Sequence, residues 1–214
     1  MSRTGQITLT LVLACTAVAS AAGYFAVWPT VVESSASESR SHYSPLSYEE
    51  FRTRLVRGDF TPMLIESAGC TLVESEVLNR EIDVSTDPRP LLNALKRKSK
   101  STVKQTQSLT IELANNNLEA STLRLFQSAE ICAKHFTITV TLQAPAGILA
   151  DYHYEIQGAP EGEGTRLTFK LDAKIKKEIS SIAHPWVPQK VQEGVEEALE
   201  RQSEAFVEAI HGDN

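Results

Sequence analysis

The chain has 214 residues and few of the residue combinations that mark common enzyme classes. Its five histidines are scattered, and no two have the spacing of metal ligands; they are His42, His135, His153, His184 and His211. There is no glycine-rich phosphate-binding loop and no nucleophile elbow. We therefore predict no metal, no cofactor and no catalytic residue, and an enzyme is the less favoured class.

Positive charge is also limited. Lys and Arg number 21 against 27 acidic residues, which gives a formal net charge of −6. A general nucleic-acid binder needs clustered cations to neutralise phosphates, so that class is excluded. One basic run, residues 96–100 with Lys104 close behind, allows two interpretations. It either complements the dipole at a helix C-terminus or contacts anionic lipid headgroups.

Cysteine is scarce as well. Of three cysteines, only Cys70 and Cys132 lie beyond the N-terminal apolar region. Outside the cytoplasm such a pair could form a disulfide. Two buried thiols are the alternative, and the sequence leaves both open.

The N-terminus is where a long run without charge does occur. Residues 7–32 contain no Asp, Glu, Lys or Arg, and a membrane-spanning helix needs about 20 apolar residues. We predict that residues 1–32 form a membrane anchor or a signal segment, with Tyr24 and Trp28 suited to the far interface. The membrane is then one partner of the protein, through residues 7–32.

Two shorter patterns in this segment keep other outcomes open. Ala17-Val18-Ala19 could be a signal-peptidase site, and Val12-Leu13-Ala14-Cys15 resembles a bacterial lipobox. An anchor, a cleaved signal and a lipoprotein all place the domain on the extracytoplasmic side. The protein would be membrane-anchored, or secreted if the segment is cleaved.

Residues 33–47 are rich in serine with interspersed charge, which predicts a flexible linker. The folded domain would then span residues 48–214. Ser47 and Glu50 match a capping box and predict a helix that ends at Gly58. A second helix should begin at Asp87-Pro88, with leucines at 91, 92 and 95 as its buried stripe.

Alternating apolar residues run from Gln105 to Ile175 and predict long antiparallel strands joined by short turns. A turn is expected at Asn115–Asn117, since Asn tolerates the positive φ of tight turns. The alternation changes phase near Ser121-Thr122 and near Lys134-His135. We expect a β-bulge at each place, and bulges bend sheets.

The last predicted element is an amphipathic helix from Pro188 to Ile210, whose apolar residues follow the 3.6-residue period. A crossover containing Pro185 leads into it, and His184 beside Trp186 is the one pair there that we would test for chemistry. The helix should pack on the concave face of the sheet. The predicted fold class is α+β, a curved antiparallel meander gripping a long C-terminal helix.

This order of elements resembles the helix-grip fold of the START-like, or SRPBCC, superfamily, which includes polyketide cyclases and coenzyme Q-binding proteins. The resemblance covers residues 76–210 and is one of pattern, without signature motifs. It departs from the family in two respects. One helix is predicted where the family often has two between its first and second strands, and one strand fewer than the usual seven.

The resemblance implies a cavity between sheet and helix that binds a lipid or another apolar small molecule. Tyr152 and Tyr154 could meet its polar end, because a buried phenol needs a hydrogen-bond partner. The residues expected to line the cavity are Phe136, Ile138, Val140, Tyr152, Tyr154, Phe169, Leu171, Val195, Leu199 and Phe206. The alternative is an envelope scaffold protein whose core is filled and holds no ligand. A cavity of several hundred Å³ would favour binding, and the sequence leaves the oligomeric state open.

Overall fold

A computed structural model describes residues 29–57, 60–67, 70–85, 101–113, 118–180 and 183–211. The predicted helix at Asp87-Pro88, the turn at Asn115–Asn117, the basic run 96–100 and the first 28 residues lie outside these ranges. Among the described residues, no helix is both long enough and apolar enough to cross a membrane.

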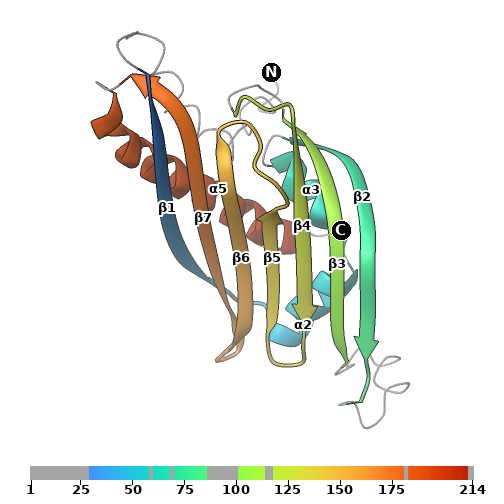
Figure 1. Ribbon diagram of the computed structural model, residues 1–214. Helices are drawn as coiled ribbons and strands as arrows, with labels where there is room; N and C mark the ends of the chain where they lie inside the picture. The colour runs from blue at the N-terminus through green and yellow to red at the C-terminus, as the bar shows by residue number, and fades with distance from the viewer. Residues whose placement is uncertain are drawn as a thin grey trace, which may run out of the picture.

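The described strands form one antiparallel sheet in the order β1-β7-β6-β5-β4-β3-β2 (Figure 1). Strands β2 to β7 follow one another as neighbours, which is the predicted meander, whereas β1 pairs with β7 at the opposite edge from β2. The strands are β1 (Pro29–Ser44), β2 (Cys70–Asp83), β3 (Thr102–Leu113), β4 (Thr122–Ile131), β5 (Phe136–Leu142), β6 (Leu149–Glu161) and β7 (Gly164–Ser180).

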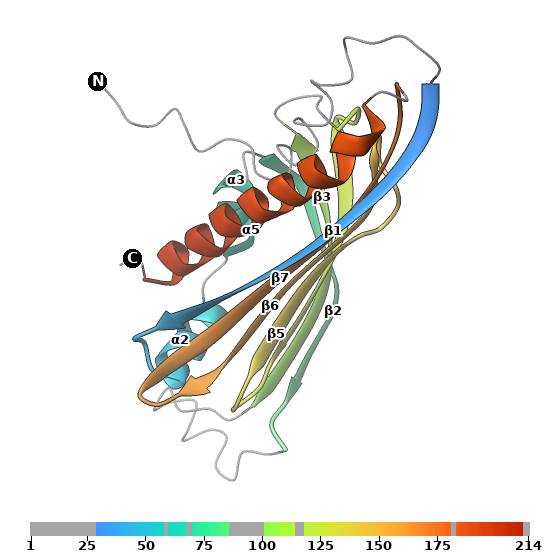
Figure 2. The ribbon, with the colours of Figure 1, turned by 90° about the vertical axis from the view of Figure 1, so that its left-hand side faces the viewer.

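The helices lie on one face of the curved sheet (Figure 2). Helices α2 (Tyr48–Arg57) and α3 (Phe60–Ser67) connect β1 to β2, and the short helix η1 (His184–Trp186) leads into α5 (Val187–His211). Helix α5 crosses the concave face of the sheet, as the amphipathic pattern predicted. The α+β helix-grip architecture is therefore confirmed.

Helix α2 begins at the predicted capping box and places Phe51 in the packed core. The Glu50 amide lies 3.4 Å from Ser47 Oγ, and the Ser47 hydroxyl donates to Glu50 Oε2 at 3.3 Å. One turn later the Phe51 ring stacks on Phe136 of β5, with centroids 5.5 Å apart, and lies 6.2 Å from the Phe206 ring of α5. These three rings join the helices to the sheet.

The prediction of a flexible linker over residues 33–47 is wrong, because Pro29–Ser44 is strand β1. It pairs with β7 from one end to the other. Its inner face carries Val32, Ser34 and Ala36, all buried, and small inner side chains gave this strand the composition of a linker. With β1 included, the described residues form seven strands, with two helices between the first and the second, which is the usual pattern of the helix-grip fold.

The two predicted β-bulges, near Ser121-Thr122 and Lys134-His135, are also absent from the described residues. Strand β4 pairs with β3 without a register shift, and it begins only at Thr122. Residues 132–135 form the turn between β4 and β5, closed by a hydrogen bond from Cys132 N to His135 O at 2.8 Å. Both phase changes therefore mark strand ends. Register shifts occur instead at Leu72/Glu74 and Val77/Asn79 in β2 and at Leu149/Asp151 in β6.

Cys70 and Cys132 do not form the disulfide that the sequence left open. Cys70 is paired with Leu113 at one end of β3, whereas Cys132 follows Ile131, the partner of Val103 at the other end. Ten residues of extended strand span about 33 Å. A disulfide needs Cα atoms closer than about 7 Å, so the fold keeps the two thiols apart.

Candidate functional site

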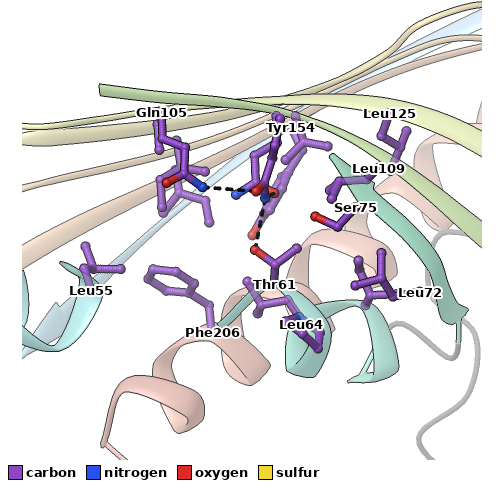
Figure 3. A pocket seen from close by; sticks show the side chains of 18 of the residues that line it. Leu55, Thr61, Leu64, Leu72, Ser75, Gln105, Leu109, Leu125, Tyr154 and Phe206 are labelled. Atoms are coloured by element: carbon purple, nitrogen blue, oxygen red, sulfur yellow. Dashed lines mark hydrogen bonds between the residues drawn. The ribbon is translucent and has the colours of Figure 1, made fainter. Parts of the chain in front are cut away.

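A cavity of about 610 Å³ lies between the sheet and the helices. Strands β2 to β6 form one wall, and residues of α2, α3 and α5 form the other (Figure 3). Aliphatic side chains make up most of the lining, and the volume falls within the range of about 300–1,000 Å³ that is usual for small-molecule sites.

Half of the residues predicted to line a cavity do so. Ile138, Val140, Tyr152, Tyr154 and Phe206 contribute to its wall. The other five fill the packed core and do not border the cavity; they are Phe136, Phe169, Leu171, Val195 and Leu199, each at most 1% exposed. The interior is thus divided into a filled region beside β7 and α5 and an open region beneath β2 to β6.

Aromatic packing keeps the second group out of the cavity. Phe169 of β7 meets Phe206 edge-on, with centroids 5.7 Å apart, and Phe136 stacks on both Phe51 and Tyr48. Because these rings pack directly against one another, no space for a ligand remains between them. Phe206 therefore lies at the border, with packed rings on one side and the cavity on the other.

One row of register partners crosses the cavity floor from β2 to β6. Its members in order are Val77, Gln107, Gln127, Val140 and Tyr154. Directly paired residues point to the same face of a sheet, and all five line the cavity. Two glutamines and a tyrosine therefore place three polar side chains in this row.

The glutamines form a hydrogen-bonded cluster that reaches helix α3. Gln107 Nε2 donates to Gln127 Oε1 at 3.1 Å and to Thr61 Oγ1 at 3.3 Å. Gln105 Nε2 donates to Gln107 Oε1 at 3.1 Å. Figure 3 shows these bonds between the sheet and α3. Among the described residues Gln127 Nε2 has no acceptor, so it keeps a donor for another molecule.

The two tyrosines differ in how their hydroxyls are satisfied. Tyr152 donates to Gln202 Oε1 at 3.4 Å. The Tyr154 hydroxyl is buried and has no hydrogen-bond partner among the described residues. Burial raises the pKa of both phenols, so both stay neutral donors. An unsatisfied buried hydroxyl costs about 1–3 kcal/mol, and a ligand oxygen would remove that cost.

The charged and ionisable groups of the lining are few. Arg80 of β2 is the single charged residue among the described lining residues, and it pairs with Gln105 at the edge of the sheet. Cys70 lies in the same wall, and burial raises the pKa of its thiol to about 11. A thiol with that pKa is protonated at neutral pH and is a poor nucleophile.

The pair His184 and Trp186, singled out for possible chemistry, lies elsewhere. Both residues are exposed on η1, and neither borders the cavity. They share no site with Tyr152, Tyr154 or the glutamines.

The sequence did contain a signal for the glutamines. Gln105 and Gln107 have the same parity as Leu109 and Ile111, so the inward face of β3 continues through both polar residues. Gln127 follows Leu125 in the same way on β4. Thr61, Ser75 and Arg80 had no comparable pattern, because α3 and β2 have weak periodicity.

Comparisons with protein-family models and with curated proteins gave no match. Solved structures with a similar chain trace include the Zhui aromatase/cyclase from Streptomyces, with 11% identity and TM-score 0.43, covering 82% of this chain and 91% of that one. A START superfamily protein from Mycobacterium smegmatis has 14% identity and TM-score 0.43, covering 79% and 93%. A protein of unknown function from Staphylococcus aureus has 10% identity and TM-score 0.49, covering 85% and 94%.

With these low identities and TM-scores, the activities of the similar proteins are not transferred to this chain. The fold rests instead on the chain's own topology. A strand at one edge is followed by two helices, a six-stranded meander and a long helix across the concave face. That arrangement is the START-like helix-grip fold.

Proposed function

We propose that the protein is a binding module for an apolar small molecule that carries at least one polar group. The observation that carries the proposal is the cavity of about 610 Å³, with a mainly aliphatic wall and a few convergent polar side chains. Small-molecule sites usually combine an apolar lining with a few such groups. The alternative of a filled scaffold core has no comparable support.

The polar end of the ligand would lie above Val140, between Gln127 and Tyr154. Neighbouring strands are about 4.8 Å apart, so the backbones of these two residues, on β4 and β6, are separated by about 10 Å. Both side chains carry a donor without a partner among the described residues. One ligand oxygen held between them would accept from both.

We also propose that the domain is held outside the cytoplasm by its N-terminal segment, or released there if the segment is cleaved. Residues 7–28 precede strand β1 and contain no charged side chain, and their length still meets the requirement of about 20 residues. Extraction of the C-terminally tagged full chain with alkaline carbonate, together with protease access from outside, tests this. Recovery in the cytoplasmic fraction would contradict it.

Filling the cavity tests the binding function. Ala129 of β4 lines the cavity, whereas Ala159 of β6 is exposed and does not. We expect the full-length chain and its A159F variant to bind the neutral dye Nile red, and A129F to bind it at least about tenfold more weakly, because the added ring occupies the site. Equal unfolding temperatures would show that A129F is folded. Equal dye affinity in folded A129F would contradict the proposal.

A further inference from the structure

We propose that the ligand is an anionic amphiphile, an apolar chain with an acidic head group, and that Arg80 binds the head group. This inference rests on the proposed binding function and adds the chemical class of the ligand. Among the described lining residues Arg80 is the single charged side chain, and none is a carboxylate. The one formal charge in this described lining is therefore positive, which complements a negative charge on a ligand.

The carboxylates nearest to Arg80 in sequence form no ion pair with it among the described residues. Glu76, Glu81 and Asp83 lie on the same strand but do not line the cavity. Among the described residues, no ion pair or hydrogen bond involves the Arg80 guanidinium. A guanidinium can form two parallel hydrogen bonds with a carboxylate, and charge-assisted bonds of this kind are stronger than neutral ones.

The position of Arg80 determines the orientation of the ligand, with the head group at the rim of the cavity and the apolar chain inside. Arg80 lies on the edge strand β2, is exposed, and pairs with Gln105 of β3. Its guanidinium can thus remain hydrated at the rim, which avoids the cost of burying a charge. The apolar chain would run inward over Ala129 and Ile138, which continue the register row of Gln105 across the sheet. A second oxygen on the ligand would reach the donors of Gln127 and Tyr154 in the adjacent row.

The test compares ligands that differ in head group. Dodecanoate and dodecanol, each below its aggregation limit, compete with Nile red for the full-length chain and for variants R80Q and R124Q. Arg124 is the matched control, because it is an exposed arginine on β4 that does not line the cavity. We expect R80Q to bind dodecanoate about five- to tenfold more weakly than the wild type, a charge-assisted bond reduced by solvent exposure.

Dodecanol should bind all three proteins equally, and R124Q should bind both ligands as the wild type does. Salt should weaken dodecanoate binding and leave dodecanol binding unchanged, because only the first involves a charge pair. If dodecanol displaces the dye but R80Q binds dodecanoate as tightly as the wild type, the head-group inference is overturned and the binding function stands. If neither the dye nor either ligand binds the wild type, both fail.

Discussion

Gly158 of β6 is the register partner of Phe136 of β5, and the Phe136 ring occupies the space where a Cβ on Gly158 would lie. Phe136 is fully buried and stacks on Phe51. The missing side chain thus allows the ring to lie flat on the sheet. This contact supports the packed region that borders the cavity.

Gly158→Ala should therefore lower the free energy of unfolding by about 1–3 kcal/mol, as expected for overpacking a rigid core. Urea denaturation of the full chain measures it. The double variant F136L/G158A should lose less than the sum of the single losses, because a smaller side chain removes the overlap. Additive losses would mean that the Phe136 ring does not oppose the new methyl group.

The two cavity tyrosines should respond to loss of the hydroxyl with opposite signs. Tyr154→Phe removes a buried donor that has no partner among the described residues, so we expect the ligand-free protein to become more stable by about 1 kcal/mol. Tyr152→Phe breaks the 3.4 Å hydrogen bond to Gln202 and should make the protein less stable. Thermal unfolding of both variants decides this, and a destabilised Y154F would contradict the described site.

Strand β1 should be essential to the fold. Its contacts with α5 include the 3.1 Å ion pair of Arg40 with Glu200 and the 2.8 Å hydrogen bond of Ser44 with His211. A chain that lacks residues 1–28 should unfold cooperatively. Removal of residues 1–44 deletes the buried Val32, exposes the edge of β7 and should abolish cooperative unfolding. Circular dichroism during heating compares them. Equal melting curves would restore the linker interpretation.

The Cys70 thiol should react slowly with alkylating reagents. Burial raises its pKa to about 11, and the reactive form is the thiolate. At pH 8 its alkylation by iodoacetamide should be at least about 100-fold slower than that of a peptide thiol of pKa about 8.5. Because a raised pKa delays deprotonation, the rate should keep rising about tenfold per pH unit up to about pH 11. Peptide mapping measures the rate at Cys70 alone, and a plateau near pH 9 would contradict the burial.

Strong periodicity made the meander and α5 predictable. In β5 to β7 and in the terminal helix, most buried residues are apolar and most outward residues are polar, so the pattern alone predicted the elements and their faces. Strand β1 lacked this contrast, because Ser34 and Ala36 take the inward positions that larger residues occupy elsewhere. Its identity depends on pairing with β7, over 120 residues away in sequence, which no local pattern encodes.

Only half of the predicted lining residues border the cavity, and the reason is related. Parity shows that Val140 and Leu171 both point inward, but not what lies opposite them. Leu171 belongs to the region packed against α5, whereas Val140 faces open space beside the glutamines. That difference depends on where α5 crosses the sheet and on the volumes of the rings around Phe206. Both depend on the tertiary structure and cannot be inferred from the parity of residues along one strand.

The most direct test of ligand binding in the cavity is a methyl NMR titration of the full-length chain with dodecanol. We expect shifts of the cavity-lining methyl groups, and unchanged signals from the packed group. The first set comprises Ile111, Leu125, Ile138 and Val140, and the second comprises Leu167, Leu171, Val195 and Leu199. Saturable shifts confined to the first set would support binding in this cavity. No shifts, or shifts mainly in the second set, would contradict it.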